Sequence, residues 1–220
     1  MLYIRSVKRY TYILFDWDGN LAKTLDIWLM AYRAAFEKQG LILSDEEVAA
    51  SFGEISVYLD KWGILKEKDI VVSDADRIGK QLLPSVELYP DALLVLETLH
   101  QQGKKIALIT SSSHENVNHL LQKHRLSKFF DTVITYEDTA RHKPYPDPLE
   151  CALKNMDGDA SRAIMIGDTD KDIRAAKNAG VDSILFYPPE HAKFYNLAAL
   201  KEHLPTYIVE DFREILAIVG

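Results

Sequence analysis

Short apolar segments that favour β-strands alternate with helical patterns along most of this 220-residue chain. Several of these segments are apolar at every position, which is typical of strands that helices cover on both faces of a sheet. The pattern predicts six strands, at residues 12–15, 105–109, 132–135, 163–166, 183–186 and 207–209. Strands of this kind are buried only in a layered structure, so the fold class is predicted to be α/β.

Helical patterns occupy the intervals between these strands, at residues 91–102, 115–124, 148–155, 172–179 and 210–219. Gly103 and Gly180 follow two of the helices, at the position where a helix end favours a left-handed residue. Regular alternation of strand and helix predicts a doubly wound parallel sheet.

The segment 22–86 departs from this alternation, because it contains helical patterns and no convincing strand. Apolar residues recur at helical spacing from Leu25 to Phe36, and Ser44 with Glu47 forms a capping box for a second helix. Two more helices are predicted at 56–62 and 66–83. We therefore expect a core domain of residues 1–21 and 87–220, with a small helical cap domain of residues 22–86 inserted after the first strand.

Aromatic residues mark one face of the first helix in this insert. Trp28, Tyr32 and Phe36 lie on the same helical stripe. Such a stripe is most simply the insert's own hydrophobic core, and we interpret it that way. Residues around 51–55 are candidates for contact with a substrate, because Phe52 and Gly53 form a plausible turn between helices.

Composition limits the possible partners. The net charge of −7 disfavours nucleic-acid binding, which needs a basic face. The single cysteine, Cys151, cannot form an internal disulfide. No apolar stretch is long enough to cross a membrane, and the run after the basic N-terminus is too short for a signal peptide. We expect a cytoplasmic monomer or homodimer whose partner is a small metabolite.

Two carboxylates follow the first predicted strand directly, in the sequence Asp16-Trp17-Asp18-Gly19. Residues one apart point to opposite sides of a strand, so Asp16 and Asp18 converge only if the chain turns, and Gly19 permits a turn. One carboxylate could then attack phosphorus while the other transfers a proton. The alternative is a plain strand-ending Asx turn.

Hydroxyl groups and a lysine follow the next strands. Thr110, Ser111 and Ser112 come after strand 105–109, where hydroxyls and backbone N–H groups can bind an anion. Ser112 with Glu115 could also form a capping box for the next helix. Lys143 precedes Pro144 in a loop with three prolines, which would hold its ammonium rigidly. The alternative for Lys143 is a solvated surface lysine.

A second pair of carboxylates follows strand 163–166. Asp168 stands at the strand end and Asp172 in the first turn of the next helix, so both can face one hard cation such as Mg²⁺. The alternative is helix N-capping by Asp168 or Asp170. All four motifs stand at the carboxyl ends of predicted strands, where open α/β sheets bind their ligands.

Taken in this order, the four motifs resemble those of the haloacid dehalogenase superfamily of phosphohydrolases, from residue 12 to the C-terminus. The helical insert is similar to the cap of the branch that contains phosphoglycolate phosphatase and beta-phosphoglucomutase. The resemblance implies that Asp16 is a nucleophile that forms an aspartyl-phosphate and also binds Mg²⁺. It implies that Asp18 is the general acid and base, with its backbone carbonyl on the metal, and that Lys143 neutralises charge between Asp16 and the phosphoryl group.

The remaining roles follow from the same resemblance. Thr110 and the Ser111 backbone would hold phosphate oxygens, Asp168 would bind Mg²⁺ directly, and Asp172 would bind it directly or through water. The resemblance therefore implies a Mg²⁺-dependent phosphatase of a small phosphate monoester. A phosphomutase and a non-catalytic phosphate-binding protein are the alternatives.

Two positions depart from the family's usual pattern. Asn20 stands where threonine is usual, and we expect its amide to hydrogen-bond the turn. Lys23 stands where an acidic residue is usual, at the entrance to the cap, where it could affect cap movement or substrate charge preference.

Overall fold

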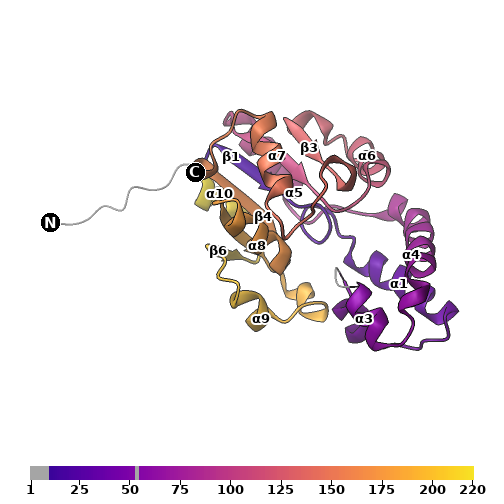
Figure 1. Cartoon of the computed structure of the whole chain (residues 1–220). Helices are drawn as coiled ribbons and strands as arrows, with labels where there is room; N and C mark the ends of the chain where they lie inside the picture. The colour runs from indigo at the N-terminus through magenta and orange to yellow at the C-terminus, as the bar shows by residue number, and fades with distance from the viewer. Residues whose placement is uncertain (1–9, 53–54) are drawn as a thin grey trace.

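The computed structural model describes residues 10–52 and 55–220, and its centre is a six-stranded sheet with the order β3-β2-β1-β4-β5-β6 (Figure 1). Every neighbouring pair of strands is parallel. The predicted α/β fold class with a doubly wound sheet is therefore confirmed. The strands are β1 (Tyr12–Phe15), β2 (Lys105–Ile109), β3 (Thr132–Ile134), β4 (Ala163–Gly167), β5 (Asp182–Phe186) and β6 (Tyr207–Val209).

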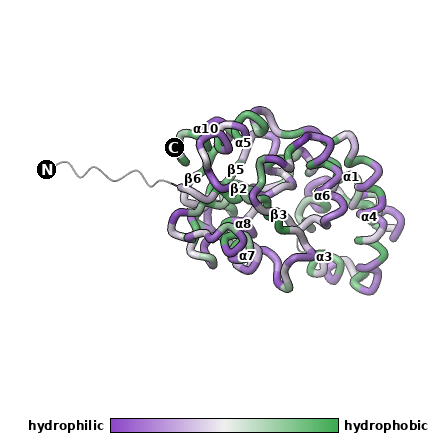
Figure 2. Tube along the Cα trace, turned by 90° about the horizontal axis from the view of Figure 1, so that it is seen from above, coloured by the Kyte–Doolittle hydropathy of each residue, from purple (hydrophilic) through white to green (hydrophobic). Residues whose placement is uncertain are grey.

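Helices cover both faces of the sheet, which explains why its strands are apolar at successive positions. Ile13 and Phe15 contribute to the hydrophobic core on one face, under α5 (Ala92–Gln101), α6 (His114–Lys123) and α10 (Phe212–Val219). Leu14 contributes to the core on the other face, under α7 (Asp147–Asn155) and α8 (Asp170–Asn178). Apolar and polar residues alternate along these outer helices (Figure 2), as expected for helices with one buried side.

The segment after β1 forms a separate helical insert, at the lower right of Figure 1. Its helices are α1 (Leu25–Lys38), α2 (Asp45–Ala50), α3 (Ile55–Lys61) and α4 (Lys68–Leu82), with 3₁₀ turns η1 (Leu65–Glu67) and η2 (Leu83–Ser85). They share a hydrophobic core of their own, which includes Leu29, Phe36, Val48, Leu59 and Val71. The described part of this segment contains no named strand, in agreement with the sequence pattern.

Local signals read from the sequence set several helix ends. The Ser44 hydroxyl accepts a hydrogen bond from the Glu47 N–H, and the Glu47 carboxylate accepts one from the Ser44 N–H, so the predicted capping box is present. Gly40, Gly103 and Gly180 all have positive φ where a helix ends. No helix in the described ranges is long and apolar enough to cross a membrane.

The segment after β5 contains structure that the sequence pattern did not predict. A 3₁₀ turn, η6 (Pro189–Lys193), and a short helix, α9 (Leu197–Lys201), precede β6. Three further 3₁₀ turns, η3 (Ser127–Phe129), η4 (Tyr136–Asp138) and η5 (Ala160–Arg162), lie in other connections. These elements are too short for hydrophobic periodicity to indicate them.

His191 anchors η6 to the sheet from a fully buried position. Its Nε2 lies 2.7 Å from the Tyr89 hydroxyl, and aromatic rings surround it: Tyr89, Phe186, Tyr187 and Tyr195. The pKa of His191 is lowered to about 4, mainly by burial, with Glu190 opposing the shift and Lys23 adding to it. The imidazole is therefore neutral in the folded protein near neutral pH.

This environment predicts a loss of stability in mild acid. Because the pKa of His191 is lower in the folded state than its ordinary value near 6.5, protonation favours the unfolded state below that pH. We expect the free energy of unfolding to fall by about 3 kcal/mol from this residue as the pH decreases from 6.5 to 4. Urea unfolding at several pH values should show a weaker pH dependence for His191→Gln than for the wild type. His119→Gln, at an exposed histidine, should retain the wild-type dependence, and equal slopes for all three proteins would contradict the prediction.

Candidate functional site

Three buried carboxylates meet at the carboxyl ends of the two central strands. Asp16 follows β1, Asp168 follows β4, and Asp172 lies in the first turn of α8. One oxygen from each lies within 4.8 Å of the others. This convergence follows from the parallel topology, since β1 and β4 are neighbours whose ends lie at the same edge of the sheet.

Two glycines make room for these carboxylates. Gly19 has φ +72°, and a Cβ there would collide with the Asp168 carboxylate. A Cβ at Gly167 would collide with the Asp172 side chain. The turn at Gly19 therefore does more than reverse the chain after Asp18, because it also lets Asp168 approach the first motif.

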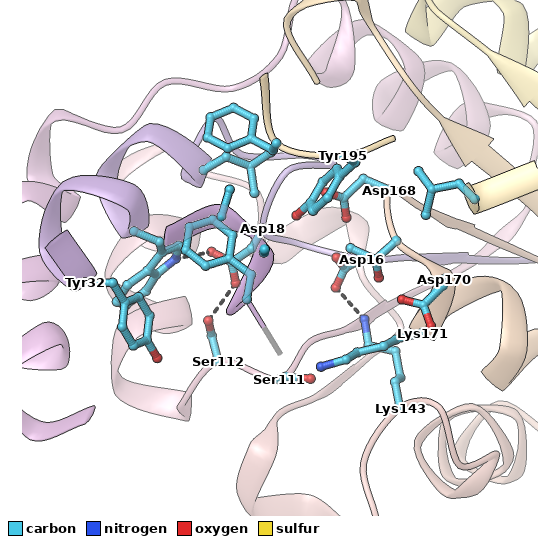
Figure 3. A pocket seen from close by; sticks show the side chains of 18 of the residues that line it. Asp16, Asp18, Tyr32, Ser111, Ser112, Lys143, Asp168, Asp170, Lys171 and Tyr195 are labelled. Atoms are coloured by element: carbon cyan, nitrogen blue, oxygen red, sulfur yellow. Dashed lines mark hydrogen bonds and ion pairs between the residues drawn. The ribbon is translucent and has the colours of Figure 1, made fainter. Parts of the chain in front are cut away.

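Lys143 reaches this acidic group from the loop before α7. Its Nζ donates to Asp16 Oδ1 at 2.6 Å (Figure 3). It also donates to Asp172 Oδ1 at 2.7 Å and to the Ile109 carbonyl at 3.2 Å. The side chain is only 5% exposed, so the solvated-surface interpretation of this lysine is wrong. Asp172 also accepts hydrogen bonds from the N–H and hydroxyl of Thr169, which makes it part of a capping box as well as of the acidic group.

Burial and mutual repulsion shift the titration of these groups. Burial raises the pKa of Asp16 to about 7, although the Lys143 ammonium opposes that shift. Burial and the charges of Asp16 and Asp172 raise the pKa of Asp168 well above its usual range. Burial alone would lower the pKa of Lys143, but Asp16 and Asp172 raise it overall. One ammonium therefore offsets only part of the negative charge of three carboxylates.

Asp168 is the member of this group whose oxygens accept no well-formed hydrogen bond. Both of its oxygens are buried, and no side chain of the described residues donates a well-formed hydrogen bond to them. The Tyr195 hydroxyl lies nearby, and burial together with the Asp168 charge raises the pKa of Tyr195. Three hard oxygen donors with an excess of buried negative charge fit a small divalent cation, which would supply the missing partner.

Asp18 lies beside this group and has partners from two parts of the molecule. Trp28 Nε1 on α1 donates to Asp18 Oδ1 at 2.9 Å, and the Ser112 hydroxyl donates to Oδ2 at 2.6 Å. The predicted capping role of Ser112 is wrong, because Ser113 is the N-cap of α6 and accepts from the Asn116 N–H. The Ser112 hydroxyl is directed to Asp18 instead.

The remaining predicted residues are Thr110 and Ser111, in the loop between β2 and α6, and Asn20, in the turn after β1. Thr110 is buried, and its hydroxyl accepts from the Ser112 N–H at 3.0 Å. Ser111 and Lys143 both line the cavity, whereas Thr110 is not among its lining residues. The Asn20 side chain is buried without a hydrogen-bond partner among the described residues, so the expectation that its amide would bond the turn is wrong. The turn is closed instead by backbone bonds, including Asn20 N–H to the Trp17 carbonyl.

A cavity of about 810 Å³ lies between the acidic group and the helical insert. Trp28 and Tyr32 line it as well as packing against the insert's core, so the interpretation of the aromatic stripe as core holds for Phe36 and is incomplete for these two. Helical spacing identifies residues that share a face but not which part of that face meets a neighbour. Phe52 also lines the cavity, while Gly53 and Glu54 lie outside the described residues.

Other lining residues had no signal in the sequence. Phe194 and Tyr195 come from the segment after η6, and no pattern indicated that this segment returns to the site. Asp76 of the insert accepts from Asn116 Nδ2 of α6 at 3.2 Å and lines the cavity. Lys23 points elsewhere, near Glu190 and over the Tyr89 ring.

The unpaired charge at Asp168 predicts a response to divalent cations. In metal-free protein, Asp168→Asn should remove repulsion among buried carboxylates and raise the Tm by about 2 to 8 °C. Addition of MgCl₂ should raise the Tm of the wild type but have little effect on the variant. Asp170→Asn is the matched control, because Asp170 pairs with Arg174 outside the acidic group. Thermal unfolding with chelator and with MgCl₂ measures both effects, and an equal response of wild type and Asp168→Asn to MgCl₂ would exclude this cation site.

Comparison with known proteins agrees with this arrangement. The family model described as haloacid dehalogenase-like hydrolase matches residues 13–186, which include all four motifs. Two solved structures have the same fold over nearly the whole chain. A hydrolase from Pseudomonas syringae has a TM-score of 0.81 at 21% identity and covers 94% of this chain and 96% of its own. A haloacid dehalogenase-like family protein from Streptococcus pneumoniae has a TM-score of 0.79 at 22% identity, with 96% and 99% covered.

Curated relatives extend the comparison to sequence. The PpaX protein of Caldanaerobacter subterraneus subsp. tengcongensis is 32% identical and covers 96% of this chain and 95% of its own length. The pyrophosphatase PpaX of Bacillus velezensis is 30% identical, with 97% of this chain and 98% of that protein covered. The chain therefore belongs to the haloacid dehalogenase-like hydrolases and is a phosphohydrolase.

Proposed function

We propose that this enzyme is a Mg²⁺-dependent phosphatase that hydrolyses a small phosphate monoester through an aspartyl-phosphate on Asp16. The observation that carries the proposal is the buried Lys143 ammonium, held 2.6 Å from Asp16 and 2.7 Å from Asp172, beside an Asp168 carboxylate whose oxygens accept no well-formed hydrogen bond. The carboxylates of such a site can balance the charge of a cation, and its ammonium can balance the charge of a phosphoryl group. The site has no comparable use in a purely structural role.

Asp16 is the nucleophile in this proposal. Its carboxylate oxygen attacks phosphorus, the bond between phosphorus and the ester oxygen breaks, and the phosphoryl group becomes attached to Asp16. Asp16, Asp168, Asp172 and the Asp18 backbone carbonyl would hold Mg²⁺, which when bound offsets the repulsion between carboxylate and phosphate. Lys143 neutralises charge on the same side, and its contact with Asp16 keeps the nucleophile oriented.

Asp18 acts as the general acid and then as the general base in this proposal. In the first step its carboxylic acid protonates the leaving oxygen, and in the second its carboxylate accepts a proton from the water that attacks the aspartyl-phosphate. Trp28 and Ser112 both donate to Asp18, an arrangement suited to the carboxylate form that the second step requires. Ser111 lies at the cavity where it can donate its backbone N–H to phosphate oxygens, and Thr110 holds that loop in shape.

Residues 22–86 would act as a cap domain over a core of residues 1–21 and 87–220. Contacts between the two parts near the site include Trp28 to Asp18, Asn116 to Asp76, and Lys80 to Glu115 at 2.9 Å. A closed cap excludes bulk water from the site while the phosphoryl group is transferred to Asp16.

A phosphomutase would use the same core residues and return the phosphoryl group to a sugar. Hydrolysis is favoured because the curated relatives carry pyrophosphatase names. A non-catalytic phosphate-binding protein is disfavoured by membership of a hydrolase family and by the presence of the carboxylates and the lysine.

Substitution of the nucleophile tests the mechanism. Asp16→Asn should reduce phosphate release from a panel of esters at least about 1,000-fold, since an amide cannot form the covalent intermediate. The panel is assayed with MgCl₂ and with a chelator, and the wild type should be inactive with the chelator. Transfer of the phosphoryl group to a sugar instead of water would indicate the mutase. Release that survives in Asp16→Asn would show that another group is the nucleophile.

The contact between Trp28 and Asp18 predicts an effect from the insert on catalysis. Trp28→Phe keeps an aromatic ring but removes the N–H donor, so kcat should fall about tenfold to a hundredfold. Trp62→Phe is the matched control, because Trp62 packs against Phe36 inside the insert. Gly79→Ala should reproduce part of the effect, since its Cβ would lie 2.6 Å from the Trp28 ring. Steady-state kinetics measures the change, and equal kcat values for the two tryptophan variants would refute the role of the N–H.

A further inference from the structure

The cavity extends well beyond the space that a phosphoryl group needs. The catalytic carboxylates and Lys143 occupy one end of the 810 Å³ volume, at the sheet (Figure 3). Pockets of this size bind drug-sized organic molecules. The rest of the volume, which lies toward the helical insert, is therefore available to the leaving group.

An aromatic wall, formed by Trp28, Tyr32, Phe52 and Phe194, borders this leaving-group space. The rings of Tyr32 and Phe52 lie 6.0 Å apart, and Phe52 stacks on Phe194 at 6.5 Å with an interplanar angle of 21°. The wall thus continues from the insert to the segment after η6. Trp28 joins it to the catalytic centre through the hydrogen bond to Asp18. Rings in such an arrangement favour flat or apolar groups.

Charge is distributed unevenly around the cavity. The two lining lysines, Lys143 and Lys171, both come from the core side. Among the described residues that line the cavity from the insert, the one charged side chain is Asp76, which pairs with Lys80 at 3.1 Å and accepts from Asn116. A leaving group with a negative charge would therefore face rings and a carboxylate, with no cation from the described part of the insert to balance it.

We propose that the leaving group of the substrate is an uncharged organic group with a flat or apolar face, held by the aromatic wall. An anionic leaving group, such as the second phosphate of pyrophosphate or the glycolate of phosphoglycolate, is disfavoured at the same place. This inference rests on the proposed phosphatase function and adds the substrate class to it. The inference also predicts a substrate that differs from the one indicated by the name pyrophosphatase of the PpaX relatives.

The test compares two esters in which the leaving oxygen is attached to the same kind of carbon. Benzyl phosphate and phosphoglycolate are both phosphate esters of a CH₂ group, which carries a phenyl ring in one and a carboxylate in the other. We expect wild-type kcat/KM to be at least about tenfold higher for benzyl phosphate, and pyrophosphate to be hydrolysed more slowly than benzyl phosphate. A higher kcat/KM for phosphoglycolate or pyrophosphate, in a reaction that Asp16→Asn abolishes, would overturn the substrate class and leave the mechanism intact.

A lysine introduced beside the aromatic wall tests where the leaving group lies. Val72 lines the cavity from α4, so Val72→Lys should shift the ratio of the two kcat/KM values about tenfold toward phosphoglycolate. Val57→Lys adds the same charge at a residue that is 62% exposed and outside the cavity, and it should leave the ratio unchanged. Equal ratios in the two variants would contradict the proposed location of the leaving group.

Binding measurements on an inactive variant test the substrate class independently of turnover. Calorimetric titration of Asp16→Asn with each ester, in MgCl₂, should show tighter binding of benzyl phosphate than of phosphoglycolate. If no ester is hydrolysed in an Asp16-dependent way, the mechanism fails, and this titration still decides the substrate class. Tighter binding of phosphoglycolate would overturn the inference.

Discussion

The buried contact of Lys143 with Asp16 and Asp172 is the interaction on which the rest of the site depends. Three carboxylates lie within 4.8 Å of one another, and a single ammonium offsets part of their charge. Without Lys143 the acidic group would strongly disfavour the folded state, because buried like charges repel and lose their hydration. With it, the Asp168 oxygens still accept no well-formed hydrogen bond, and burial with the charges of Asp16 and Asp172 raises the pKa of that carboxyl. Three carboxylates crowded in this way fit a divalent cation, on which the proposed activity would depend.

The parallel sheet brings these groups together from distant parts of the chain. Its order places β1 between β2 and β4, so the loops after all three strands open at one edge. Close approach then requires the glycines at 19 and 167, where any side chain would occupy the space of a carboxylate. Precise charge placement thus results from strand order and from missing Cβ atoms, both of which are properties of a rigid scaffold.

The helical insert lines the cavity with side chains of a different kind from those of the core. Its cavity face is aromatic, whereas the core side is ionic, and the bond from Trp28 to Asp18 connects the two. Exclusion of water by an aromatic surface strengthens the electrostatic interactions that hold a phosphoryl group, because the local dielectric falls. In the proposed function the same surface, extended by Phe194, would also select the leaving group. The ionic and aromatic parts of the cavity meet at the contact of Trp28 with Asp18.

Much of this protein was determined by its sequence alone. Continuous apolar strands require cover on both faces, so local pattern was enough for the fold. The order of the four motifs and their resemblance to a known superfamily then indicated the acidic site of Asp16, Asp18, Lys143, Asp168 and Asp172. Only the tertiary structure decided that Ser112 bonds Asp18 while Ser113 caps α6, that Trp28 and Tyr32 face the cavity, and that Phe194 joins them. Each of these depends on packing between segments far apart in the chain, and a helical stripe has the same spacing whether it faces a core or a cavity.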